Sequence, residues 1–330
     1  MAMTETKSSR NTAAQEQKKA ANRRRTIVYL VLLAIALIAP FLAYPVFLMK
    51  ILCFALFASA FNLVLGYTGL LSFGHAAFLA TGGYFTGYLL SNHAITPEIG
   101  IITGTIAAII LGTFFGLLSI RRQGIYFAMI TLALAQLVFF FYLQADFTGG
   151  EDGMQGVPRG YLFGFIDLEN NLAMYYFVLA IFLLGFLLIQ RTIHSPFGQV
   201  LKAIRENEPR ATSLGYNVDA YKLVAFVISA GLAGLAGSTK TVVFQLASLN
   251  DAHWHMSGEV ILMTLVGGVG TLVGPIVGAT FVLTLTHQLA QSAVGDWVNV
   301  ILGVVFVACV MAFRAGIVGE IQKFAKKNFK

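Results

Sequence analysis

Long apolar stretches separated by short polar breaks run along most of this chain. A helix needs about 20 mostly apolar residues to cross a membrane. The stretches do not show the roughly 10-residue alternating segments of a membrane β-barrel. The pattern therefore predicts an all-α, polytopic membrane bundle of about ten transmembrane helices. The candidate spans are residues 27–44, 50–65, 66–91, 99–120, 124–143, 172–190, 222–245, 258–273, 274–293 and 297–313.

Two glycine-rich breaks interrupt this pattern, one in each half of the chain. The first is Gly66–Gly69, which is followed by Leu71–His75, and the second is Gly267–Pro275. Gly and Pro end helices. Broken backbone at membrane depth is tolerated only where it is buried in protein or lines a watery path. The breaks thus hint at an internal repeat and a transport route.

The residues at and beside the breaks are the candidates for the translocation path and its gate. Two of them have a second interpretation: His75 as a hydrogen-bonded packing residue, and Glu259 as the N-terminal cap of its helix. Because both chain ends are predicted on one side, eight crossings plus a re-entrant pair is the alternative to ten. The path candidates are Tyr67, Thr68, Ser72, His75, Glu259, Gly267, Gly268, Gly270 and Pro275.

A charged island, residues 191–221, separates two of the apolar stretches. Ser195 and Pro196 suit the N-cap and first position of a helix. An apolar stripe follows at helical spacing, Pro209 interrupts it, a second short turn runs through Arg210–Leu214, and Gly215 suits a stop. An ordered charged helix here predicts a handle for a soluble partner. The stripe is Phe197, Val200, Leu201 and Ile204.

Composition and charge agree with a membrane protein and set its topology. The chain is 57% hydrophobic and 11% charged, against about 25% charged in soluble domains. Counting Lys and Arg, seven lie in the tail at 1–26, two at 121–122, five in the island with Lys222 and five in the tail at 314–330, together 19 of 22. The positive-inside rule then places these segments and both termini in the cytoplasm, and the acidic loop 144–171 outside.

The tail at 1–26 is predicted to be disordered, with its positive charge close to anionic lipid on the cytoplasmic side. The net charge of +7 therefore reflects topology and not nucleic-acid binding.

The sequence has no recognisable catalytic or metal-binding constellation. Residues 231–240 lack the adjacent Gly-Lys of a phosphate-binding loop, and the glycines at 231, 234 and 237 predict a helix packing face. His253 and His255 with Asp251 form a weak metal pattern, and a contact of the outer surface is favoured over it. Lys240, near the outer end of its span, is expected to reach the interface.

The apolar spans carry no chain of buried acids, which ion-driven carriers use. Energy is therefore expected to come from a cytoplasmic ATPase that docks on the island. A regulatory or assembly partner is the alternative.

Five segments, in order and without a large insertion, resemble one family across about residues 27–313. It is the permease subunit of branched-chain amino acid ABC importers, of the LivM type in the LivH/LivM family. The resemblance implies a fold similar to type II ABC importers, with the island as the region that docks on the ATPase. The segments are 66–87 (GYTGLLSFGHAAFLATGGYFTG), 122–136 (RQGIYFAMITLALAQ), 148–156 (TGGEDGMQG), 198–217 (GQVLKAIRENEPRATSLGYN) and 264–278 (TLVGGVGTLVGPIVG).

The same resemblance implies the residues and partners of the coupling region. Its motif positions are Gly198, Ala203, Glu206, Asn207, Ala211 and Gly215, beside the charged Lys202 and Arg205. The implied partners are a paralogous LivH-type permease, two ATPase subunits that hold ATP and Mg²⁺, and a periplasmic amino-acid-binding protein. The chain itself would bind no cofactor, hydrolyse no ATP and lie in the bacterial inner membrane.

The implied function is import of leucine, isoleucine and valine by alternating access. The alternatives are a related importer for urea or amides, aromatic acids or a sugar, and an ATP-independent carrier.

Overall fold

The computed structural model describes residues 33–93, 95–292, 297–312 and 316–320. The chain divides into two units, residues 1–48 and 49–330. In the first unit an apolar helix covers Leu33–Leu42. The predicted tails at 1–26 and 314–330 lie outside the described residues, apart from 316–320, which are helical.

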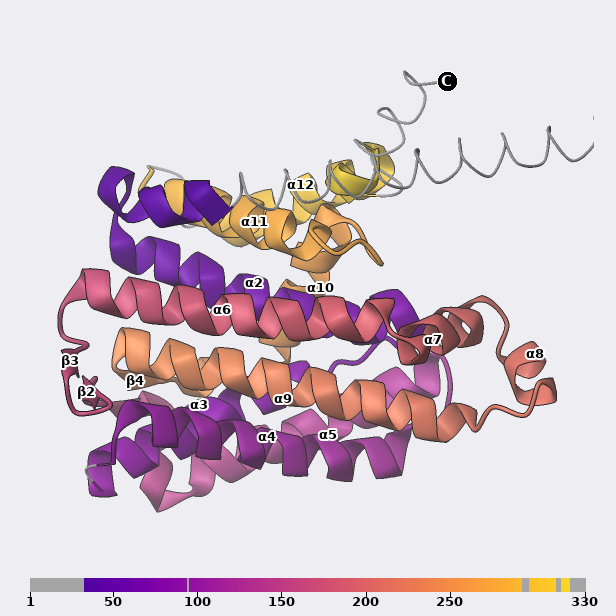
Figure 1. The fold of residues 1–330 in the computed structure, drawn as a ribbon, viewed down its shortest axis with the longest axis horizontal. Helices are drawn as coiled ribbons and strands as arrows, with labels where there is room; N and C mark the ends of the chain where they lie inside the picture. The colour runs from indigo at the N-terminus through magenta and orange to yellow at the C-terminus, as the bar shows by residue number, and fades with distance from the viewer. Residues whose placement is uncertain (1–32, 94, 293–296, 313–315, 321–330) are drawn as a thin grey trace, which may run out of the picture. The chain divides into compact units, whose positions relative to one another are not determined.

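Each of the ten predicted spans contains a helix, and the helical membrane bundle is confirmed (Figure 1). Two short helices, α7 (Pro196–Glu206) and α8 (Glu208–Ser213), occupy the island. After Leu33–Leu42, the long helices are α2 (Pro45–Thr68), α3 (His75–His93), α4 (Pro97–Ser119), α5 (Ile125–Gln144), α6 (Asn171–His194), α9 (Val218–Phe244), α10 (Trp254–Gly267), α11 (Gly274–Ala290) and α12 (Val298–Ala312).

By length and composition, five of the described helices can cross a membrane: α2, α4, α5, α6 and α9. Helix α10 has only 14 residues, about 21 Å at the helical rise, against a hydrocarbon core of about 30 Å. The number of crossings therefore stays a prediction.

Short strands and turns cap one end of the bundle in residues 49–330, where α5 and α9 end and α6 begins. Strand β1 (Met154–Gln155) pairs with β4 (Leu246–Ala247), and β2 (Tyr161–Leu162) pairs with β3 (Ile166–Asp167), both antiparallel. The buried Arg159 guanidinium donates to the Val243 carbonyl at 2.7 Å and to Asn171 Oδ1 at 3.0 Å. Three single-turn helices complete this capped end: η1 (Asp146–Thr148), η2 (Gly150–Asp152) and η3 (Leu249–Asp251).

Helix α9 packs against both α3 and α4 through glycines that bring backbones into contact. A methyl group at Gly237 would lie 1.9 Å from the Leu79 carbonyl oxygen of α3. At Gly234 it would lie 2.2 Å from Ala108 Cβ of α4. The predicted packing face of α9 is confirmed, because small side chains let helices approach closely.

One face of α4 is exposed and apolar, with residues three and four apart along its length. A face of this kind suits contact with lipid or another membrane subunit. Its residues are Ile99, Ile102, Ile106, Ile110, Phe114 and Leu117.

The prediction that the first break starts at Gly66 is wrong, because α2 continues to Thr68. The break is the segment 69–74, which opens on Gly69 at φ 78°. Gly66 serves a close approach instead: a methyl group there would lie 2.7 Å from the backbone nitrogen of Gly270. The second break is confirmed, since α10 ends at Gly267 and α11 begins at Gly274.

The glycine packing of α9 predicts a position-specific loss of stability. We expect Gly237→Ala to lower the free energy of unfolding by about 1–3 kcal/mol, because the methyl group overpacks a backbone contact. Gly303→Ala in α12, where a methyl group meets nothing within 4 Å, is the control and should be neutral or slightly stabilising. Thermal unfolding of the purified protein in detergent measures both. Equal midpoints for the two variants would contradict the close packing.

Candidate functional site

The island folds into two capped helices. Ser195 Oγ accepts from the Gly198 amide at 3.3 Å, which confirms the N-cap of α7. Asn207 ends α7 and caps α8, accepting from the Arg210 amide at 3.0 Å. Pro209 was predicted to interrupt the island helix. It lies instead in the first turn of α8, where its missing N–H costs nothing. Gly215 ends α8 at φ 88°.

A small apolar cluster holds the two helices to the start of α9. Ile204 of α7, Ala211 of α8 and Val218 of α9 are buried together, and Val200 and Tyr221 pack against them. Gly198 is also buried. A methyl group there would lie 2.3 Å from the Ile193 carbonyl oxygen at the end of α6, so a larger residue would clash. The apolar stripe thus faces the bundle. On the opposite side, Gln199, Ala203 and Glu206 are exposed at spacings of four and three.

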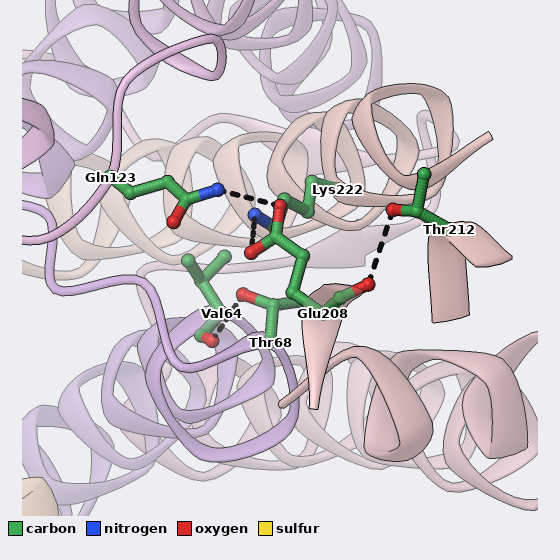
Figure 2. Close-up of polar contacts among 6 residues, drawn as sticks. All are labelled: Val64, Thr68, Gln123, Glu208, Thr212 and Lys222. Carbon is green, nitrogen blue, oxygen red and sulfur yellow. Dashed lines mark hydrogen bonds and ion pairs between the residues drawn. The ribbon is translucent and has the colours of Figure 1, made fainter. Parts of the chain in front are cut away.

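An ion pair anchors α8 to the bundle (Figure 2). Lys222 Nζ of α9 lies 2.7 Å from Glu208 Oε2, and the Lys222 side chain is only 2% exposed, whereas Glu208 is 25% exposed. Gln123 Nε2 donates to Glu208 Oε1 at 2.8 Å. The turn around 121–124 therefore lies at the same end of the bundle as the island, as the predicted topology requires.

Helix α7 also reaches the end of α2 and the second break. The Arg205 guanidinium donates to the Gly66 carbonyl. Asn62 Oδ1 accepts from the Gly270 amide, and Asn62 Nδ2 donates to the Thr271 carbonyl, both at 2.8 Å. A methyl group at Gly270 would lie 2.8 Å from Arg205 Nη1. We call these five residues, Asn62, Gly66, Arg205, Gly270 and Thr271, the inner junction.

The first break is held in the same way by α10. Ser257, in the first turn of α10, accepts from the Ala76 amide at 3.0 Å and donates to the Phe73 carbonyl at 2.7 Å. Each break is therefore bonded by a polar side chain from a helix next to the other break. Asn62 of α2, the helix before the first break, bonds 268–273. Ser257 of α10, the helix before the second break, bonds 69–74. Side-chain hydrogen bonds thus run from α2 to the second break and from α10 to the first.

The predicted path residues are distributed over the end of α2, the two breaks, the start of α3, helix α10 and the start of α11. Tyr67 and Thr68 lie in the last turn of α2, with Lys202 Nζ 5.8 Å from the Tyr67 ring centroid. Gly267, Gly268, Gly270 and Pro275 lie at the second break, and Pro275 is in the first turn of α11. Ser72 lies in the first break, where its hydroxyl accepts from the Gly74 amide at 3.1 Å.

His75 lies at the start of α3 and is fully buried. Its Nε2 lies 2.9 Å from Ser229 Oγ, which in turn donates to the Ala60 carbonyl at 2.5 Å. Three phenylalanine rings, Phe61, Phe78 and Phe226, contact the imidazole edge to face. This geometry suits the packing interpretation, and a role in the path stays a prediction.

The interpretation of Glu259 as a helix cap is wrong. Helix α10 begins at Trp254 with His253 as its N-cap, so Glu259 lies in the second turn. It lies in electrostatic range of Lys50, Lys240 and Asp251. Lys240 does not simply reach toward the interface, because its ammonium pairs with the Asp251 carboxylate of η3.

Sequence reasoning missed Asn62, Ser257 and Gln123, whose side chains join the elements described above. For Asn62 a signal existed: it is an amide inside an otherwise apolar span, and polar side chains at membrane depth need a partner. For Ser257 and Gln123 the partner lies far along the chain, and no local pattern reports it.

The fold and these contacts define a helical membrane protein with an ordered two-helix element anchored at one end. The family model described as branched-chain amino acid transport system / permease component matches residues 45–310. The chain belongs to this family.

Curated relatives agree with the family. The high-affinity branched-chain amino acid transport system permease protein LivM of Salmonella typhimurium is 26% identical over 260 residues, which is 70% of this chain and 59% of that protein. The Escherichia coli LivM is 27% identical over 253 residues, again 70% and 59%. The chain therefore spans less than two thirds of these two relatives. The autoinducer 2 import system permease protein LsrC of Photorhabdus laumondii is 26% identical over 41% of each chain. No solved structure matches.

The anchor of α8 predicts an asymmetry between two neighbouring acids. We expect Glu208→Gln to lower the free energy of unfolding by about 1–2 kcal/mol, since it leaves the buried Lys222 charge without its partner while Glu208 itself is partly solvated. Glu206→Gln, at an exposed site, should stay within about 0.5 kcal/mol. Thermal unfolding in detergent compares them. Adding Lys222→Met to Glu208→Gln should recover part of the loss, and no recovery would show that the pair does not anchor α8.

Proposed function

We propose that this chain is a permease subunit of an ATP-driven importer that moves branched-chain amino acids across a bacterial inner membrane by alternating access. The single observation that carries the proposal is the inner junction, in which Arg205 of the island bonds the Gly66 carbonyl beside Gly270. A push on the island from outside the membrane is thereby passed to both breaks. The family description supplies the substrate class.

The island has the form expected of a docking element for an ATPase. Its inward face is fixed by the apolar cluster and by the Glu208–Lys222 pair. Its outward face, with Gln199, Ala203 and Glu206, is exposed. Because α7 and α8 share one apolar cluster, a force applied to that face is expected to move both helices together.

We assign the partners by the same reasoning. Two cytoplasmic ATPase subunits would dock on the islands of this chain and of a paralogous LivH-type permease, and ATP with Mg²⁺ would bind on those subunits. A periplasmic amino-acid-binding protein would deliver substrate at the capped end, and lipid would surround the apolar helix faces. Both termini would lie in the cytoplasm.

In the proposed cycle, ATP binding closes the ATPase dimer and displaces the islands. Arg205 carries that displacement to the end of α2, and Asn62 carries it to the second break. Ser257 links α10 to the first break. The breaks then change conformation together and move access from one side to the other. Gly268 and Gly270, both at positive φ, give the second break this freedom.

The competing carrier hypothesis is less well supported, because the charged groups near the spans are few and the Lys240–Asp251 pair is neutral. An importer for another small solute would keep the same island and junction. The LsrC similarity covers 41% of the chain, whereas the similarity to LivM covers 70%, which favours amino acids.

Loss of the Arg205 bond should uncouple ATP hydrolysis from transport. We expect Arg205→Gln to lower uptake of labelled leucine at least about tenfold in proteoliposomes that hold the complete importer, since a charge-assisted bond is removed. ATP hydrolysis stimulated by the loaded binding protein should persist. Arg122→Gln, at an exposed site in the 121–124 turn, is the control and should leave uptake near the wild-type rate.

Two outcomes would overturn the proposal. Uptake by the wild-type importer without ATP would refute ATP coupling. Wild-type uptake by the Arg205→Gln variant would refute the inner junction as the route of coupling.

A further inference from the structure

Four charged side chains from four different elements gather near the capped end. Lys240 lies four residues before the end of α9, and Asp251 ends η3. Glu259 lies in the second turn of α10, and Lys50 in the second turn of α2. Lys50, Lys240 and Asp251 are the charged groups that act on the Glu259 carboxyl. We call these four residues the outer quartet.

Only one direct ion pair is formed within the outer quartet. Lys240 Nζ pairs with Asp251 Oδ1, and the two side chains are 15% and 9% exposed. Within the described part of the chain, neither Lys50 nor Glu259 makes a direct ion pair, although both are partly buried. Partly buried charges without a direct partner are costly at membrane depth and mark functional sites. One cation and one anion thus remain available.

Two aromatic side chains complete the surroundings of the quartet. Lys240 Nζ lies 5.5 Å from the Phe54 ring centroid, and the ring face offers the ammonium a second favourable position. Tyr84 is fully buried, its hydroxyl has no hydrogen-bond partner among the described residues, and it lies in electrostatic range of Asp251. A buried hydroxyl without a partner is costly, and a polar ligand would satisfy it.

The charges of the quartet match one class of ligand. The two cations and two anions of the quartet give it a net charge of zero. The quartet therefore favours a neutral molecule that carries both charges over a bare anion or a bare cation. A free α-amino acid is such a molecule, with a carboxylate and an ammonium on the same carbon. If it inserts between Lys240 and Asp251, each side chain exchanges one opposite charge for another, and no charge is left unpaired.

We propose that the outer quartet is an entry site for zwitterionic amino acids, in which Lys240 binds the ligand carboxylate and Asp251 binds the ligand ammonium. Lys50 and Glu259 keep the site neutral, and Phe54 contributes an apolar contact for the ligand side chain. The proposal rests on the proposed import of amino acids and assigns the residues of this chain that first receive them.

Binding of labelled L-leucine to the detergent-solubilised permease–ATPase complex, without nucleotide or binding protein, tests the proposal. The competitors are unlabelled L-leucine, L-leucinamide, which lacks the carboxylate, and 4-methylpentanoate, which lacks the ammonium. We expect each single-charge analogue to compete about tenfold less well than leucine, because each loses one charge-assisted contact. Equal competition by either analogue, or no leucine binding by the wild type, overturns the proposal.

Variants assign the two charges separately. Lys240→Met and Asp251→Asn should each weaken leucine binding at least about tenfold. Lys240→Met should leave competition by leucinamide unchanged, because that analogue has no carboxylate to lose. Asp251→Asn should likewise leave competition by 4-methylpentanoate unchanged. A merely structural ion pair would weaken all three ligands alike, and that result contradicts the proposal.

Two controls keep the test decisive. Lys240→Arg retains the charge and should keep leucine binding within a few-fold of wild type, whereas a loss equal to that of Lys240→Met overturns the charge assignment. Asp152→Asn removes an exposed acid of the capped end and should leave leucine binding unchanged; a loss equal to that of Asp251→Asn would count against the site. ATP-dependent uptake by the wild type is measured on the same preparation, so failure of the importer hypothesis is seen independently of leucine binding.

Discussion

Backbone groups freed where helices break at membrane depth must find partners inside the protein, because lipid offers none. The segments 69–74 and 268–273 are predicted to lie at membrane depth and so to face this constraint, and polar side chains on neighbouring helices bond their backbone groups. Asn62 bonds Gly270 and Thr271, Ser257 bonds Phe73 and Ala76, and Arg205 bonds Gly66. The need to satisfy broken backbone thus determines which elements are connected.

These connections give the molecule a mechanical route from one end toward its middle. The island is fixed to α9 by an apolar cluster and an ion pair, and to α2 by Arg205. Helix α9 is packed so closely on α3 and α4 through Gly234 and Gly237 that the three helices form a firm support. Because the inner junction joins the island to the second break, the two are expected to move together relative to this support.

Local patterns predicted much of this arrangement. The apolar stretches predicted a helix at the place of every described long helix. Ser195 and Pro196 predicted the start of α7, and Gly215 predicted the stop after α8, because capping depends on adjacent residues. The structural roles of Gly66 and Glu259 were predicted wrongly for the same reason. Each residue can end or cap a helix, and the prediction assumed that it does. Gly66 instead allows the Gly270 backbone to approach, and Glu259 instead faces the charges of α2, α9 and η3.

Contacts between residues far apart in the sequence could not be predicted from it. Arg205 and Gly66 are 139 residues apart, and Asn62 and Gly270 are 208 apart, so no periodicity or cap signal reports them. The central claim is that the island and the second break move as one body. Spin labels at Gln199 and Val269, with Cys53 and Cys309 replaced, measure their separation in the assembled importer without nucleotide and with ATP. We predict an unchanged separation between these two labels while the separation from Gln199 to Asp152 changes; a shift between Gln199 and Val269 as large as that to Asp152 would contradict the account.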